Sequence, residues 1–211
     1  MTTTVDLWVD PICPYAWMTS RWLLEVEPER DLELKFHIMS LSVLNDGVEG
    51  LPDFYRELLE QGWGPVRIAI AVERDHGSEA LRRFYDTFGD LHHVGGADLG
   101  PELFTQVLDK AGLPRELAAA ADDAALDEPL GVSHHAGMDA VGEEVGTPVL
   151  HIHTDGGLVA FFGPVVVPPP TGEAAVKLWD GVVAVASTDG FFELKRSRDR
   201  EPGDYLRPGQ G

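Results

Sequence analysis

The only cysteine in this chain of 211 residues stands where a thiol is expected to be reactive. Cys13 follows an apolar run, Val5 to Val9, that predicts a buried strand, and precedes Pro14 and a helical pattern. Proline suits the first helical position, where no N–H is needed. Cys13 is therefore predicted to cap a helix that begins where a strand ends. Free cysteines are usually inert hydrophobes, but a helix N-terminus favours an anion, so we expect a lowered thiol pKa and a nucleophilic thiolate.

Other residues that could do chemistry give weaker signals. Asp10 could raise the pKa of Cys13 as a nearby anion, although a turn residue that ends the strand is the favoured interpretation. Trp17 and Trp63 could form an aromatic wall, but such residues are usually core. A small basic cluster could attract an anionic substrate or partner, but a solvated tail is favoured; it comprises Lys195, Arg196, Arg198 and Arg200.

Histidines occur in three close pairs: His92 and His93, His134 and His135, and His151 and His153. The last two share one face of a predicted strand and could both reach a metal. A closed site would need further ligands, so we predict hydrogen-bonded or solvated histidines and no metal site. His134 or His135 could border a substrate groove.

The elements around Cys13 are predicted from hydrophobic periodicity. After the first helix, which fades near residues 28–30, alternation over 32–38 predicts a second strand, and 39–50 a loop. Helices are predicted in the segment that follows, with an interruption at Gly62 to Pro65 and a helix N-cap at Ser78; they cover 51–61, 66–74, 78–88, 99–111, 115–122 and 126–145.

The last third returns to strands. Residues 149–152 and 158–162 predict a hairpin around Asp155-Gly156-Gly157, and Thr171 is predicted to cap a final helix. The polar tail from Ser197 is expected to be poorly ordered. Periodicity alone therefore supports an α/β protein with a helical segment.

Composition narrows the class of protein. Sixteen basic against thirty-six acidic residues give a formal charge of −20, which argues against nucleic acid and anionic membranes as partners. No apolar run is long enough to span a bilayer, and no signal peptide is visible. One cysteine cannot form an internal disulfide, so we expect a cytoplasmic protein.

Several motifs resemble one known group. Cys13-Pro14-Tyr15-Ala16 after a strand resembles the redox motif of thioredoxin-like proteins, specifically the DsbA-like branch, and Thr147-Pro148 resembles that fold's cis-proline loop. Further segments are similar to the mycothiol-dependent reductases of the DsbA family, which include nitroreductase-type enzymes; these are 162–164, 178–181 and 190–196. The resemblance implies a thioredoxin-like fold, β-α-β then β-β-α, over 1–49 and 146–211, with an all-helical insertion over 50–145.

The resemblance also implies a function and a site. Cys13 would be the redox centre, and a bound thiol would contact Pro14, Tyr15, Ala16, Trp17, Thr147 and Pro148. No tightly bound cofactor is implied; mycothiol or a similar small thiol would be the cosubstrate, acting on a small electrophile or disulfide, with the protein a monomer or homodimer. The family's second motif cysteine is replaced by Ala16, so an external thiol must resolve a mixed disulfide at Cys13. Natural monothiol chemistry and a substitution made to trap an intermediate would both place alanine there.

Two other functions remain open. Kappa-class glutathione transferases and chromene-carboxylate isomerases look similar, with serine where Cys13 stands, and activate a bound thiol without redox change. A non-catalytic thiol-binding module is the third alternative, and Ala16 motivates it.

Overall fold

The computed structural model of the chain describes residues 2–142 and 144–207. Its four-stranded sheet has the order β2-β1-β3-β4, with the strands β1 (Thr3–Val9), β2 (Leu32–Ile38), β3 (Val149–Thr154) and β4 (Gly157–Phe162). β1 pairs with β2 in parallel and with β3 antiparallel, and β3 and β4 form the predicted hairpin. The apolar residues predicted for β1 and β2 are buried, which confirms both strands.

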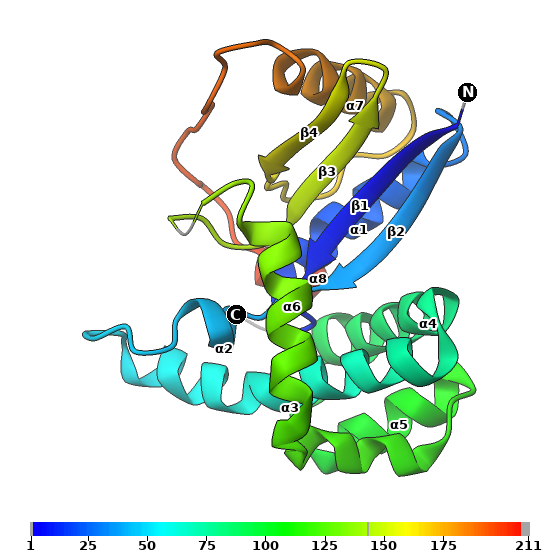
Figure 1. Cartoon of the computed structure of the whole chain (residues 1–211), viewed down its shortest axis with the longest axis vertical. Helices are drawn as coiled ribbons and strands as arrows, with labels where there is room; N and C mark the ends of the chain where they lie inside the picture. The colour runs from blue at the N-terminus through cyan, green and yellow to red at the C-terminus, as the bar shows by residue number, and fades with distance from the viewer. Residues whose placement is uncertain (1, 143, 208–211) are drawn as a thin grey trace.

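Helices cover both faces of this sheet (Figure 1). α1 (Pro14–Val26) and α7 (Gly172–Ala186) pack together, and the indole N–H of Trp22 donates to the Ala175 carbonyl across their interface at 2.9 Å. α6 (Asp127–Met138) lies against β2 and β3 on the other face. The order β-α-β, helices, β-β-α agrees with the fold class expected from the sequence.

The segment between β2 and β3 is helical, with the elements α2 (Leu41–Leu44), α3 (Asp53–His76), α4 (Ser78–Gly89), the π-helix η1 (Asp90–Val94), α5 (Pro101–Ala111), the 3-10 helices η2 (Arg115–Asp122) and η3 (Ala124–Leu126), and α6. The predicted interruption at Gly62 to Pro65 is wrong, because α3 continues through Pro65. Tertiary packing outweighs the lost backbone hydrogen bond. A Cβ on Gly62 would stand 2.8 Å from Ile12, so this glycine lets α3 approach the cysteine loop closely.

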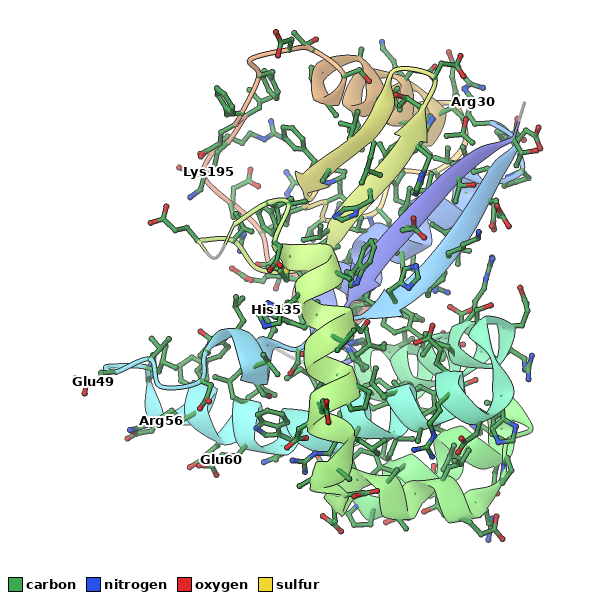
Figure 2. All side chains as sticks on the ribbon, in the orientation of Figure 1. Arg30, Glu49, Arg56, Glu60, His135 and Lys195 are labelled. Carbon is green, nitrogen blue, oxygen red and sulfur yellow. The ribbon has the colours of Figure 1, made fainter. Side chains whose placement is uncertain are left out.

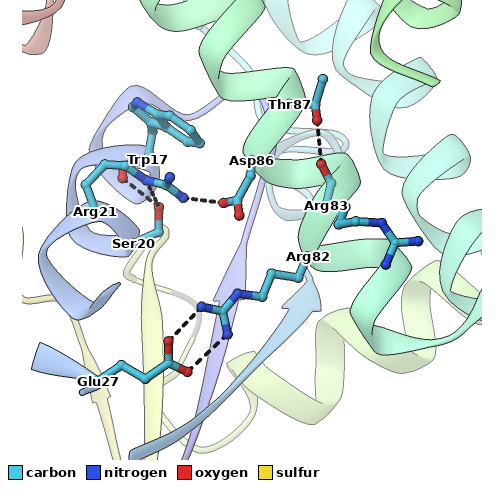
Figure 3. Close-up of polar contacts among 8 residues, drawn as sticks. All are labelled: Trp17, Ser20, Arg21, Glu27, Arg82, Arg83, Asp86 and Thr87. Carbon is cyan, nitrogen blue, oxygen red and sulfur yellow. Dashed lines mark hydrogen bonds and ion pairs between the residues drawn. The ribbon is translucent and has the colours of Figure 1, made fainter. Parts of the chain in front are cut away.

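α4 is attached to α1 by two ion pairs (Figure 3). Arg82 binds Glu27 with both guanidinium nitrogens, at 2.6 and 3.0 Å, and Arg21 binds Asp86. Figure 3 also shows Arg21 beside Trp17, where the guanidinium carbon lies 3.8 Å from the ring centre. The helical segment is thereby fixed to the helix that follows Cys13.

Several boundaries differ from the sequence predictions. The expected loop after β2 contains the short helix α2. The N-cap of α4 is Gly77, whereas Ser78, the predicted cap, is the first residue of the helix. α6 ends at Met138 rather than at 145. Thr171 occupies the N-cap position of α7 but donates and accepts no capping hydrogen bond.

The tail prediction is wrong over the described residues. α8 (Pro202–Leu206) packs against α1, with Pro202 buried and a capping box between Glu201 and Asp204. Among the helices described, none is both long enough and apolar enough to cross a membrane.

Candidate active site around Cys13

Cys13 caps the first helix as predicted. Its backbone is extended, with φ −83° and ψ 110°, and Pro14 is the first residue of α1. The Cys13 carbonyl accepts the N–H of Trp17 at 3.1 Å, which closes the first helical turn. The thiol therefore sits over the unpaired N–H groups of that turn.

A buried carboxylate holds the loop before Cys13. Asp10 is fully buried, and its two oxygens accept the N–H groups of Ile12 at 3.0 Å and of Leu41 at 2.7 Å. It thus links the end of β1, the cysteine loop and α2. Burial raises the pKa of Asp10 to about 7, against the lowering effect of the two backbone hydrogen bonds. The expectation of a simple turn residue at Asp10 is therefore incomplete, and the position of Asp10-Pro11 directly before the cysteine loop is the sequence feature that could have indicated its role there.

His93 holds the same loop from the helical side. It lies on η1, is 5% exposed, and its Nε2 is 2.8 Å from the Pro11 carbonyl oxygen. Burial and, to a smaller extent, the neighbouring His92 lower the pKa of His93 to about 3, so the ring is neutral and donates this hydrogen bond. π-helical turns often occur at functional sites, and this one aims His93 at the residue pair before Cys13.

The Thr147-Pro148 peptide bond is cis and faces the thiol, which confirms the expectation for this loop. The Cys13 Sγ lies 3.8 Å from the Thr147 carbonyl oxygen, and the Thr147 hydroxyl donates to the Trp8 carbonyl at 3.1 Å. The Thr147 carbonyl therefore lies beside the sulfur, in a buried position. A role for Thr147 and Pro148 in binding a thiol compound stays a prediction.

The predicted lowering of the thiol pKa is wrong in this arrangement. Cys13 is 7% exposed, and burial raises its pKa to about 12. That net value includes a contribution from the charge of Asp10, which also raises the pKa, and the opposing effects of the Ala16 and Tyr15 N–H groups. Desolvation of a thiolate thus outweighs the helix N-terminus, so the nucleophile forms only when solvent or a ligand reaches the sulfur.

Two aromatic residues border the site differently. Tyr15 is partly exposed in the first turn of α1, where its hydroxyl donates to Glu201 at 2.5 Å. Tyr55 comes from α3 and is also partly exposed; burial raises its pKa, as do the charges of Cys13 and Asp10. Sequence reasoning missed Tyr55, because nothing in a helical pattern shows which face meets a cysteine far away in the chain.

Two predicted contact residues belong to the core instead. Trp17 is 2% exposed and packs against Tyr85, with ring centres 5.7 Å apart, and the Ala16 side chain is fully buried. Neither side chain has a surface for a bound thiol. Trp63 lines an open hollow between α3 and the loop after α2.

The two histidines of each pair bind different partners. His134 is buried and its Nδ1 accepts the N–H of Ser40 at 3.2 Å, whereas His135 is exposed on α6 (Figure 2). His151 binds the Gly137 carbonyl at 3.0 Å, and His153 binds Asp6 at 2.6 Å. Over residues 2–142 and 144–207, no three histidine, cysteine or acidic side chains are arranged to hold a metal ion.

Comparison with known proteins agrees with this geometry. The family described as Rv2466c-like, mycothiol-dependent nitroreductase Rv2466c, matches residues 12–196. The uncharacterized protein Rv2286c of Mycobacterium tuberculosis (strain ATCC 25618 / H37Rv) is 34% identical over 202 residues, which cover 93% of this chain and 83% of that protein.

Solved structures show the fold. The cytosolic disulfide reductase DsbM from Pseudomonas aeruginosa matches with a TM-score of 0.55 and 20% identity, over 86% of this chain and 98% of its own. A probable DsbA oxidoreductase, SCO1869 from Streptomyces coelicolor, matches with a TM-score of 0.58 and 15% identity, over 93% and 94%. The fold is therefore the DsbA-like thioredoxin fold with inserted helices.

Proposed function

The chain belongs to the Rv2466c-like family of mycothiol-dependent nitroreductases, and from that membership we propose that it is a monothiol oxidoreductase that uses mycothiol. One observation carries the proposal: the single thiol caps α1 and lies 3.8 Å from the carbonyl that precedes the cis-proline. Once a ligand or solvent reaches the sulfur, the helix N–H groups can stabilise a thiolate there, and the backbone of Thr147 is the nearest group that could pair with a bound thiol compound.

The chemistry follows from a single sulfur. The Cys13 thiolate attacks one sulfur of a disulfide substrate, forms a mixed disulfide and releases the other sulfur as a thiolate. A mycothiol thiolate then attacks the mixed disulfide and releases the Cys13 thiolate. Because Ala16 is buried and carries no thiol, the second attack has to come from outside the chain. With a nitro compound as acceptor, two mycothiol molecules supply two electrons and leave a nitroso product, water and one disulfide. The cytoplasm, which keeps small thiols reduced, is the matching compartment.

The proposal is tested by trapping the mixed disulfide. The reduced chain is incubated with the mycothiol disulfide, and intact-mass spectrometry is expected to show one mycothiol adduct per chain, at Cys13. Cys13→Ala is the control and should remain unmodified. Added mycothiol should remove the adduct, while an equal concentration of glutathione should do so more slowly. A wild-type chain that takes up no adduct, although its Cys13 reacts with a small alkylating reagent, would refute the proposal.

The raised thiol pKa supports a second candidate function. If Cys13 keeps its proton, the helix N-terminus can instead activate a bound thiol without redox change at Cys13, as in a transferase or isomerase of the kappa-class type. Cys13→Ser separates the two functions. Turnover retained by the serine variant would favour the transferase class, whereas its loss together with the mixed disulfide would favour the oxidoreductase.

A further inference from the structure

The C-terminal segment, residues 197–207, reaches from the first turn of α1, next to Cys13, to Gly96, which follows the π-helix that carries His93. The chain runs down one edge of the molecule from α7 to α8 (Figure 1), and Lys195 points outward along this stretch (Figure 2). Near the start of α1, the Arg198 guanidinium carbon lies 4.6 Å from the centre of the Tyr15 ring. At the other end, a Cβ on Gly96 would stand 3.5 Å from an Arg207 nitrogen, just after the turn that carries His93.

The segment is held in this place by its own contacts. Pro202 is buried, Leu206 packs against the main core cluster, and Glu201 accepts the hydrogen bond of Tyr15. Arg198 therefore reaches the rim of the site from a docked segment rather than from a solvated tail. The match to the family model ends at residue 196, so Arg198 and α8 lie outside the matched residues.

Arg198 lies at this rim beside the Tyr15 hydroxyl, which donates to Glu201. Within the described part of the chain, no carboxylate lies within ion-pair distance of its guanidinium, whereas Arg200, two residues further on, pairs with Asp199 at 3.0 Å. Burial raises the pKa of Cys13, and the charge of Arg198 opposes that rise as the smallest of the effects on the thiol. In a protein with a formal charge of −20, a cation at this rim weakens the repulsion that an approaching anion meets.

We propose that Arg198 is a specificity-determining residue of the Cys13 site, one that favours electrophiles carrying negative charge next to the reacting atom. The proposal rests on the proposed function, since it takes Cys13 as the attacking sulfur. An anionic reagent is repelled by the thiolate, by Asp10 when ionised and by the acidic surface. The guanidinium lies over the ring of Tyr15, two residues from Cys13, and offsets part of that repulsion as the reagent approaches.

The test compares two alkylating reagents that differ in charge. Iodoacetate is anionic and iodoacetamide is neutral; with either, the Cys13 thiolate attacks the methylene carbon, a thioether forms and iodide leaves. Both rates scale with the same thiolate fraction and the same exposure of the sulfur, so their ratio isolates the effect of charge. Rates are measured by intact mass at pH 8.5 on the reduced full-length chain.

Arg198→Ala is expected to lower the ratio of iodoacetate to iodoacetamide rates by about three- to tenfold, as expected for one charge near the surface. Arg198→Lys should keep most of the wild-type ratio. Arg200→Ala is the matched control, because it removes the same charge from the same segment at a residue that pairs with Asp199, and it should leave the ratio unchanged. At about 1 M salt the difference between wild type and Arg198→Ala should largely vanish.

An unchanged ratio in Arg198→Ala, or an equal fall in Arg200→Ala, would overturn the proposal. Failure of the proposed function has a different signature: no mixed disulfide with mycothiol, but an alkylation ratio that still depends on Arg198. Absence of reaction at Cys13 with either reagent would overturn both.

Discussion

The first helix is held from two sides in two different ways. On the α4 side, Glu27 binds Arg82 through a bidentate pair whose side chains are 22% and 28% exposed, and the buried Trp17 lies beside Arg21, which binds Asp86. On the C-terminal side, α8 packs against α1 with Pro202 buried, and the polar contacts are one hydrogen bond from the partly exposed Tyr15 and one guanidinium over its ring. The α4 side should therefore carry the stability of the helix, and the C-terminal side should govern access and charge at the thiol.

The largest expected effect tests the buried side of this comparison. Trp17→Ala should lower the free energy of unfolding by about 3–5 kcal/mol, because it empties a large volume of the core. Tyr15→Ala, two residues away on the exposed side, should cost less than about 1 kcal/mol. Urea unfolding followed by circular dichroism measures both. Equal losses in the two variants would mean that the C-terminal segment stabilises the fold as much as the core does.

A pH-dependent effect should come from Asp10, on the buried side of the loop. Its folded pKa of about 7 exceeds the unfolded value of about 3.9. Between these values the folded chain holds a proton that the unfolded chain has lost, so Asp10 makes stability fall as pH rises from about 4 to about 7. Asp10→Asn lacks this slope, and the stability of wild type relative to the variant should therefore fall by about 2–3 kcal/mol between pH 5 and 7.5.

The same variant should change the thiol. Because the charge of Asp10 raises the pKa of Cys13, Asp10→Asn should shift the alkylation-rate profile to lower pH. Asp46→Asn, an exposed carboxylate, is the control and should leave the profile in place. A profile that moves to higher pH would show that the hydrogen bonds of Asp10, rather than its charge, control the sulfur.

An intermediate effect is expected where a salt bridge is only partly buried. Glu27→Gln should destabilise the fold by about 1 kcal/mol, since it removes the charge of a bidentate pair while keeping one acceptor. Glu201→Gln, the matched change on the C-terminal side, should leave the unfolding midpoint within error. A larger loss in the Glu201 variant would reverse the assignment of roles to the two sides.

The sequence predicted what depends on local pattern. The strand, the Cys13 cap, Pro14 at the helix start and the β-hairpin follow from periodicity and turn chemistry, and the cis bond before Pro148 followed from the family resemblance. Prediction from the sequence failed where contacts between segments far apart in the chain determine the structure or a pKa. α3 continues through Pro65 because its glycines allow close contacts. The thiol pKa rises because burial outweighs the helix N-terminus, and burial is a property of the whole fold.

The tail shows the same limit and leads to the smallest predicted effect. Its composition indicated disorder, yet Pro202 and Leu206 dock on residues more than a hundred positions earlier in the chain. Tyr15→Phe removes the hydroxyl that donates to Glu201 and keeps the ring under Arg198. Global stability should change by less than about 0.5 kcal/mol, while the amides of α8 should exchange hydrogen faster. Glu27→Gln should leave α8 exchange unchanged relative to its global stability. If α8 exchanges no faster in Tyr15→Phe, the segment is held by its apolar contacts alone, and the ring of Tyr15 serves only as the platform for Arg198.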